Sequence, residues 1–475
     1  MVIRLSNRFD NYQTWIKNSQ ITSIRAKVIV DTDLAEIMEE TNLLFIGAIL
    51  SIALGGLSLR LVRRNENLAW NEAIAAHILC LMFITKGIQN AATGYFNEEV
   101  LSTDGLVWQF WLEIAFAMDY IFAASICSIA LLYPVPFLRN IKQVKIGFSI
   151  IAGFIVFRLI LDVVGLNFTA LHIPGFVYYS SSLLWGTVYI KFRLAPREKR
   201  TDATRNIALL AGLFLTLVLG HVWMWWPGLI LQSEYFFFID LGGGSFTSTL
   251  WDFMWTSGYS IGIAAGLAIV SIEVYQAIKG DPNKLLYIIA PYFALGLIGY
   301  SIYSTGSDTG FVLGEGKGEV LELWSIFTTN LHFTIARPII AMYILLKFGL
   351  FDINEKTKPM AKIMSIILIV VATSAILELI QSVIPINQMI TAALLGIIIA
   401  FGIGWEEKSF HTLVSNPADL RKGVDKKWFP EIDIPRKYIH RIDWACLIYC
   451  LVALLVSFII WQMDILVNIA IERGA

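Results

Sequence analysis

Ionisable side chains interrupt the long apolar stretches of this sequence. A charge in such surroundings costs several kcal/mol unless it is paired or hydrated, so each of these residues is a candidate for a functional site. They are Lys86, Glu113, Asp119, Arg158, Asp162, His221, Asp252, His332, Arg337 and Glu378. Acids, bases and imidazoles together predict a binding chemistry, in which opposite charges hold a small polar or lipid-like ligand.

Six of these residues form the predicted ligand-binding set: Asp119, Arg158, Asp162, His221, His332 and Arg337. Arg158 and Asp162 are four residues apart, so one helix face can carry them as an ion pair. Arg337 precedes Pro338, whose missing N–H leaves helix carbonyls that the guanidinium can satisfy. His332 and Arg337 are five residues apart and do not share a face of an α-helix. We therefore expect the site to be assembled between helices.

The sequence holds none of the common catalytic motifs. It has no GxxxxGK[ST] phosphate loop, no HExxH zinc helix and no GxSxG nucleophile elbow. The cysteines stand in apolar stretches and lack the CxxC spacing of zinc or redox sites; they are Cys80, Cys127, Cys446 and Cys450. We therefore predict no catalytic residue, no metal and no cofactor, and we expect that the chain is not an enzyme.

The composition indicates which elements must position these residues. Of 475 residues, 57% are apolar and only 15% are charged, whereas about a quarter of a soluble protein is charged. This excludes a soluble enzyme and predicts a polytopic membrane protein whose main partner is the lipid bilayer. The formal net charge of −1 gives no basic excess for a nucleic-acid partner.

Apolar runs long enough to cross about 30 Å of hydrocarbon predict an all-α fold with about twelve transmembrane helices. The predicted spans are 43–63, 70–92, 107–133, 146–166, 174–192, 206–230, 249–277, 284–303, 323–349, 361–382, 387–405 and 443–465. They divide the chain into a polar N-terminal segment (1–42), a first helical half (43–230), an outer loop rich in aromatic residues and glycine (231–248), a second helical half (249–405), a basic amphipathic segment (406–442) and a last helix with a short tail (443–475).

Basic residues are distributed very unevenly between alternate loops. The loops after the odd-numbered spans, together with the span ends next to them, hold 26 Lys and Arg residues, whereas the opposite loops and the C-terminal tail hold only Lys317 and Arg473. Because positive loops stay on the cytoplasmic side, this predicts a cell-membrane protein with both termini extracytoplasmic. Most ionisable residues then lie in the outer halves of their spans. They either line a cavity that opens outward, or they contact headgroups where long helices extend beyond the hydrocarbon.

Two later stretches resemble the multi-helix membrane sensor region of bacterial and archaeal sensor histidine kinases. In that family an RP…Y…LRYRLFDI-like phrase closes a long helix, and an amphipathic LR…VDRLFY-like segment leads toward the kinase. Here the counterparts read ARPIIAMYILLKFGLFDI, from residue 336, and LRKGVDKKWFP, from residue 420. The phrase SICSIALLYPVP, around Tyr133, resembles another helix end of such sensors. The resemblance covers about a quarter of the chain and implies a sensor.

The chain departs from that family where the kinase would begin. Instead of a phosphoacceptor histidine and an ATP-binding domain, a basic stretch with His440 leads into another apolar span. The sequence therefore predicts a sensor or receptor without its own catalytic output, whose signal leaves through a cytoplasmic protein partner on the basic loops 191–205 and 406–442. One alternative is an ion-coupled secondary transporter that uses Asp119 or Asp162 as carrier. Another is a structural subunit of a membrane complex.

Overall fold

The computed structural model of the chain describes residues 34–101, 107–164, 167–231, 249–305, 324–325, 327–351, 357–364, 366–367 and 417–472. Within these ranges the regular secondary structure is helical, and no strand occurs. This confirms the predicted all-α fold class. The predicted span 387–405 and most of 361–382 lie outside the described residues, as do most of the predicted N-terminal segment and nearly all of the predicted aromatic loop.

Five of the described helices are long and apolar enough to cross a membrane, which supports the predicted membrane character. Their apolar parts are Trp70–Ala92, Asp202–Trp223, Gly258–Ile278, Leu285–Thr305 and Phe327–Lys347. A helix suits this environment because all of its interior backbone groups are hydrogen-bonded within the segment.

Described helices occur at the first nine predicted spans and at the last. In chain order they are α3 (Leu34–Arg64), α4 (Trp70–Leu101), α5 (Val107–Leu132), α6 (Ile141–Val164), α7 (Asn167–Arg193), α8 (Asp202–Trp223), α9 (Trp226–Leu231), α12 (Thr249–Ile278), α13 (Leu285–Thr305), the π-helix η2 (Asn330–Ala336), α15 (Arg337–Lys347) and α18 (Arg436–Glu472). Short 3₁₀ turns lie at Arg197–Lys199 and Lys426–Trp428.

The sixth predicted span is interrupted by a turn. Helix α8 ends at Trp223, and α9 begins at Trp226. Pro227 follows, and its ring and missing N–H prevent an α-helix from continuing through it. The backbone N–H groups of Met224 and Trp225 instead bond three residues back, as is common where a helix tightens at its end.

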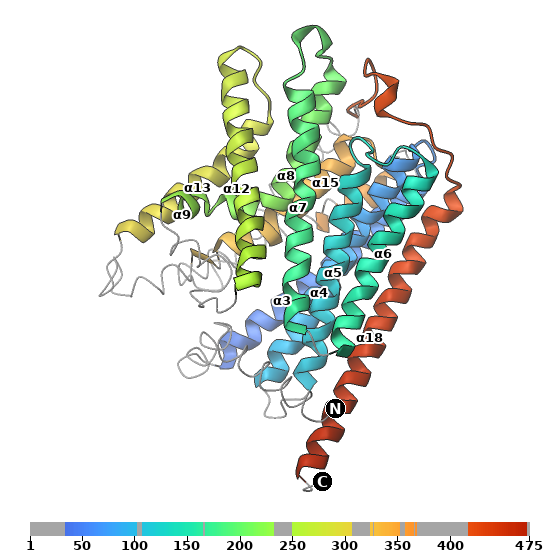
Figure 1. Cartoon of the computed structure of the whole chain (residues 1–475), viewed down its shortest axis with the longest axis vertical. Coiled ribbons are helices and arrows are strands. Elements are labelled where there is room, and N and C mark those ends of the chain that lie inside the picture. Colours follow the sequence, from blue (N-terminus) through green and yellow to red (C-terminus); the bar gives the residue numbers. More distant parts are fainter. Residues whose placement is uncertain are drawn as a thin grey trace.

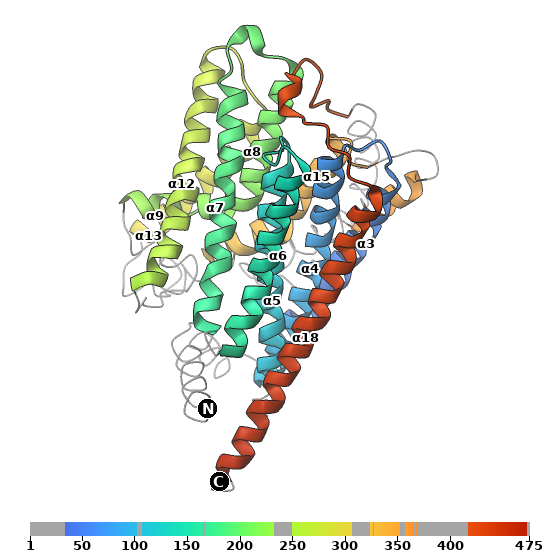
Figure 2. The same ribbon diagram turned by 45° about the vertical axis from the view of Figure 1, so that its right-hand side comes forward.

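The helices form a bundle with α8 at its centre. Figure 1 shows α3 to α8 running roughly side by side, with α12 next to α7, and Figure 2 shows α18 along the outside of α5 and α6. Nearly every side chain of α8 is buried. Trp185 of α7 stacks on Phe214 of α8 with 4.7 Å between ring centroids, and it donates to the Tyr133 carbonyl at 2.8 Å. Large aromatic side chains therefore fix the centre of the bundle.

Helices α3 and α4 approach each other closely at two glycines. A Cβ on Gly55 would lie 2.6 Å from Ile84, and one on Gly87 would lie 2.6 Å from Ile52. Small residues permit such backbone approach between membrane helices, where van der Waals packing replaces the hydrophobic drive.

Residues 417–435, which we call the strap, connect the ends of several helices. The Ala418 N–H donates to the Lys347 carbonyl at 2.8 Å, and the Asn206 amide donates to the Asp419 carbonyl at 3.2 Å. Figures 1 and 2 show the strap at the same end of the molecule as the α7–α8 and α12–α13 loops, opposite the C-terminal end of α18.

The strap also reaches the loops beside α4 and α5. The Trp70 indole N–H donates to the Pro430 carbonyl at 3.1 Å, and Arg139 donates to the Lys427 carbonyl at 2.6 Å while its guanidinium faces Trp428. The loops that the sequence predicts to share one face of the membrane thus meet at one end of the described structure. We call this end the basic end.

Candidate functional site

Three residues of the predicted binding set lie together, and aromatic side chains surround them. His221 comes from α8, His332 from η2, and Arg337 from the first turn of α15. Tyr178 of α7 and Tyr292 of α13 complete the group. We call these five residues the His–Arg site.

The π-helix brings His332 and Arg337 to the same side. The Arg337 N–H bonds to the carbonyl of His332, five residues earlier, so the turn is wider than that of an α-helix. Both side chains therefore reach the carbonyl oxygen of Leu217, His332 Nε2 at 3.2 Å and Arg337 Nε at 3.3 Å. The expectation that they do not share a face was wrong because it assumed α-helical spacing.

Pro338 gives a local reason for the wide turn. It stands in the first turn of α15, and in a continuous α-helix its ring would clash with the carbonyl four residues earlier. From the sequence, we expected Arg337 to satisfy carbonyls released by this proline. The Arg337 side chain instead reaches across to a carbonyl of α8.

His332 is completely buried and has a hydrogen-bond partner at each ring nitrogen. The Leu217 carbonyl can only accept, so Nε2 carries the hydrogen. Nδ1 then accepts from the Tyr292 hydroxyl, at 3.3 Å. A Cβ on Gly220 would lie 2.7 Å from His332 Cε1, so only glycine leaves room for the ring.

His221 lies next to His332. Its Nε2 is 3.3 Å from the Thr329 hydroxyl oxygen, and the two imidazole centroids are 6.3 Å apart. The Phe333 ring contacts both imidazoles, with centroid distances of 4.9 and 5.0 Å. The two imidazoles thus share one mostly aromatic environment.

Arg337 is held by hydroxyl, carbonyl and aromatic groups. Its Nη2 donates to the Tyr178 hydroxyl at 2.6 Å, and that hydroxyl donates to the Val218 carbonyl at 2.9 Å. The guanidinium carbon lies 4.3 Å from the Phe333 ring centroid and 5.0 Å from that of Phe122. Cation–π contacts of this kind offset part of the cost of removing the charge from water.

Asp119 lies about one helical turn from this site. It precedes Phe122 by three residues on α5, and the Gln89 amide of α4 donates to its carboxylate. Lys86 in turn donates to the Gln89 side-chain oxygen at 3.0 Å. In the predicted orientation α5 runs inward, so this polar group lies on the outer side of Phe122.

The structure does not place the other two predicted residues in the site. Arg158 and Asp162 belong to α6, which packs against α5, α7 and α18, and their side chains lie outside the described part. The side chains of Glu113, Asp252 and Glu378 lie outside it as well. Among the residues described, no group of three or more His, Cys, Asp and Glu side chains has an arrangement that could hold a metal ion.

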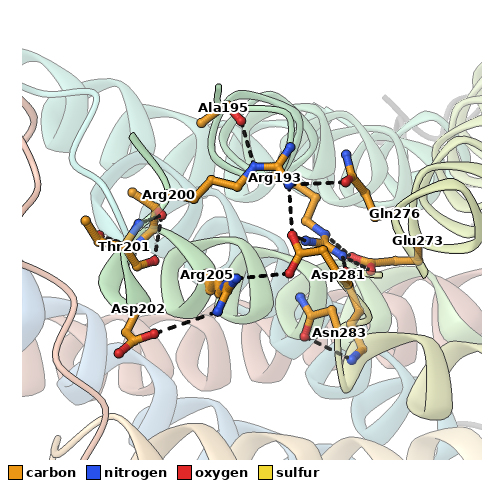
Figure 3. Close-up of polar contacts among 12 residues, drawn as sticks. Arg193, Ala195, Arg200, Thr201, Asp202, Arg205, Glu273, Gln276, Asp281 and Asn283 are labelled. Atoms are coloured by element: carbon orange, nitrogen blue, oxygen red, sulfur yellow. Dashed lines mark hydrogen bonds and ion pairs between the residues drawn. The ribbon is translucent and has the colours of Figure 1, made fainter. Parts of the chain in front are cut away.

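A second polar cluster, which was not among the expected sites, lies at the basic end (Figure 3). Arg193, at the end of α7, has a side chain that is 2% exposed, and Glu273 of α12 has one that is 0% exposed. Arg193 Nε and Nη2 donate to the two carboxylate oxygens of Glu273, at 3.0 and 2.8 Å. The Tyr189 hydroxyl donates to Glu273 at 2.7 Å. This paired, charge-assisted geometry is the strong form of an ion pair.

Asp281, in the α12–α13 loop, extends this ionic cluster. Its carboxylate lies 3.0 Å from Arg193, 2.8 Å from Arg200 and 3.1 Å from Arg205. Partial burial raises the pKa of Asp281, but the three guanidinium groups outweigh this effect and hold the pKa below its usual range. The cluster therefore fastens the α7–α8 loop to the α12–α13 loop.

The sequence contains no pattern that pairs Arg193 with Glu273. Arg193 counted only as one of the basic residues that set the orientation, and Glu273 was not among the ionisable candidates. Their partnership joins positions 80 residues apart. The one available signal was the general rule that a buried carboxylate requires a partner.

No family model, no curated protein and no solved structure matches this chain. The resemblance to the sensor region of histidine kinases therefore stays a prediction. What the chain does has to be argued from the geometry of the His–Arg site and of the basic end.

Proposed function

We propose that this chain is a multi-pass membrane protein of the sensor or receptor type, without a catalytic output domain of its own. In this proposal it has about twelve spans and lies in the cell membrane with both termini outside. A small ligand enters from the outer side and binds the His–Arg site. The observation that supports this proposal is that a π-helix places His332 and Arg337 so that both bond to the carbonyl of Leu217.

The π-helix supplies an element with two arrangements. A π-turn holds one more residue than an α-turn, so a return to α-helical hydrogen bonding changes the register. One residue corresponds to a rotation of about 100° around the helix axis. A ligand that binds His332 and Arg337 better in one register shifts the population toward it, by as much as its affinities for the two registers differ.

Helix α15 connects this element to the basic end. It follows η2 directly, and its last residue, Lys347, accepts a hydrogen bond from Ala418 of the strap. The carbonyls of Gly349 and Leu350 accept from Asn65, beside the end of α3. A rotation of α15 would therefore move the strap, whose exposed basic residues are the proposed contact for a cytoplasmic protein partner.

An ion-coupled transporter is the second candidate. The observation that favours it is the adjacent pair of imidazoles, His221 and His332, because ionisable chains inside membrane helices often relay protons. A transporter must expose the site to each face in turn, whereas a receptor needs access from one face only. A structural subunit, the third candidate, needs no access to the site from either face.

Cysteine labelling tests this proposal without a known ligand. In a background that lacks Cys80, Cys127, Cys446 and Cys450, single cysteines replace four residues: Asn90 and Ala336 in the outer halves of α4 and η2–α15, and Ala76 and Ala341 in the inner halves. Membrane-impermeant thiol reagents are then added to either side of oriented vesicles.

The receptor proposal expects labelling of the Asn90 and Ala336 positions from the outer side alone. Labelling of the Ala336 position from both sides would favour transport. If neither outer position reacts from outside, the outward-facing site does not exist, and the structural-subunit reading takes its place. Ala76 and Ala341 are buried, so they serve as matched controls that should react from neither side.

A further inference from the structure

We infer that the His–Arg site binds the carboxylate of a small organic acid at the guanidinium of Arg337. This inference rests on the proposed function, because it names the ligand class of the same site. It is carried by the charge balance at Arg337, by the directions in which the guanidinium can still form bonds, and by the side chains around it.

The charge of Arg337 has no acidic partner in the part of the chain that the structure describes. Its contacts there are the Leu217 carbonyl, the Tyr178 hydroxyl and three aromatic rings. Arg193 differs, because it is buried and has Glu273 and Asp281 as acidic partners. A cation in apolar surroundings normally takes an anion, and at Arg337 a ligand can supply it.

Among the described residues, the guanidinium contacts aromatic rings and donates hydrogen bonds from two of its three nitrogens. Phe333 and Phe122 lie against it, at 4.3 and 5.0 Å from the guanidinium carbon to the ring centroids. Nε donates to Leu217 and Nη2 to Tyr178, while Nη1 has no hydrogen-bond acceptor among the described residues. A planar carboxylate that enters in the plane of the guanidinium can accept from Nη1 and Nη2 together.

The surroundings favour a monovalent acid with an apolar body. Arg337 contributes one positive charge. The two ring nitrogens of His332 have the hydrogen-bond partners of a neutral imidazole, one acceptor and one donor. A carboxylate balances this charge, whereas a phosphate dianion would leave an excess negative charge in apolar surroundings. The rings of Phe122, Tyr178 and Phe333 around Arg337 suit the apolar part of such an acid.

Matched pairs of probes test this inference on the purified full-length protein in lipid nanodiscs. The probes are benzoate and hexanoate, each compared with its neutral amide of the same shape, at pH 7. Binding is read from the probe-dependent rise in the unfolding temperature, which gives an apparent Kd. We expect at least one carboxylate to bind at least tenfold more tightly than its amide.

Two variants locate the binding. Arg337→Gln should weaken carboxylate binding at least tenfold, and Arg337→Lys should weaken it less, because lysine keeps the charge but loses the paired geometry. Arg60→Gln, at an exposed arginine of α3, should leave binding unchanged. If Arg337→Gln does not fold, Tyr178→Phe replaces it, and we expect severalfold weaker binding because a hydrogen-bond partner of Arg337 is lost.

Each other outcome overturns the inference. Equal binding of acid and amide, or unchanged acid binding by the Arg337 and Tyr178 variants, would mean that the site does not select an anion. The same holds if neither acid binds. None of these results bears on the cysteine labelling, so an outward-open site can survive as the proposed function even if its ligand is not an acid.

Discussion

The space for the His332 ring depends on the absence of a side chain at Gly220. A Cβ there would lie 2.7 Å from His332 Cε1 and 2.8 Å from Tyr292 Cε1. We predict that Gly220→Ala lowers the free energy of unfolding by about 1–3 kcal/mol, as overpacking usually does. It should also weaken binding of any carboxylate that stabilises the unaltered protein.

Gly56→Ala is the matched control for this prediction. Gly56 also lies within a helix, and a Cβ there would meet nothing within 4 Å, so alanine should be neutral or should stabilise α3 by up to about 1 kcal/mol. Thermal unfolding in nanodiscs measures both variants. Equal effects of the two substitutions would mean that Gly220 does not set the position of His332.

At the scale of single residues, the sequence identified the candidates but not all of their relations. The cost of ionisable groups in apolar spans indicated His221, His332 and Arg337, and the structure brings these three together. The side chains of Arg158 and Asp162 lie outside the described part, so their role stays a prediction. Arg193 was missed because a basic residue at a helix end can either set the orientation in the membrane or form an ion pair. Only the tertiary contacts show which of the two roles it has.

Among the elements, the π-helix η2 is the one whose removal is most informative. Deleting Thr334 takes one residue out of the wide turn, which should return Asn330–Ala336 to α-helical hydrogen bonding. His332 and Arg337 would then be four residues apart and would still share a face. We predict a folded protein with an unchanged or higher unfolding temperature.

The deleted variant should lose the response at the basic end. A spectroscopic label on the strap at Lys422, which is exposed, would report the movement that a stabilising carboxylate causes in the full-length protein. We expect no such movement after the deletion. If the label responds equally in both proteins, the change of register does not carry the signal.

Element positions were predictable where hydropathy alone decides them. In the part of the chain that the structure describes, helices occur where the long apolar runs predicted them, because only a helix satisfies its own backbone in hydrocarbon. The break between α8 and α9 was missed although Pro227 signals it, since the apolar run continues through the turn. The π-turn could not be read from the sequence, because a proline in a helix also permits a simple kink.

At the scale of the whole molecule, the ionic cluster joins two pairs of helices at the basic end. Arginine partners hold the pKa of Asp281 below its usual range, so its stabilising contribution is present above about pH 4 and is lost as the pH falls through the lowered pKa. We predict that Asp281→Asn lowers the free energy of unfolding at pH 7 by about 1–3 kcal/mol. The difference from the unaltered protein should shrink as the solution is acidified below pH 4.

Asp202→Asn is the control for this pH dependence. The Asp202 side chain is 98% exposed and lies 3.9 Å from Arg205, so its removal should change stability by less than about 0.5 kcal/mol at any pH. Denaturant unfolding between pH 3 and pH 7 measures both variants. A constant difference between the Asp281→Asn variant and the unaltered protein across this range would contradict the prediction.

The meeting of the basic loops at one end was predictable, but their connections were not. The uneven distribution of Lys and Arg predicted that these loops share one face, and the described loops do lie together (Figure 1). The contacts that join them, such as Trp70 with Pro430 and Arg193 with Glu273, depend on how the helices pack. One sequence carries no signal for such distant pairs.

The strap also has a consequence for how the protein is made. Trp70 donates to the Pro430 carbonyl, and Arg63 of α3 pairs with Asp443 of α18. These partners of the first helices exist only after the ribosome has added more than 350 further residues. Until then the ends of α3 and α4 remain incompletely bonded, and closing so long a loop is slow. A nascent chain that stops before residue 417 would therefore present these ends to the quality-control proteases of the membrane.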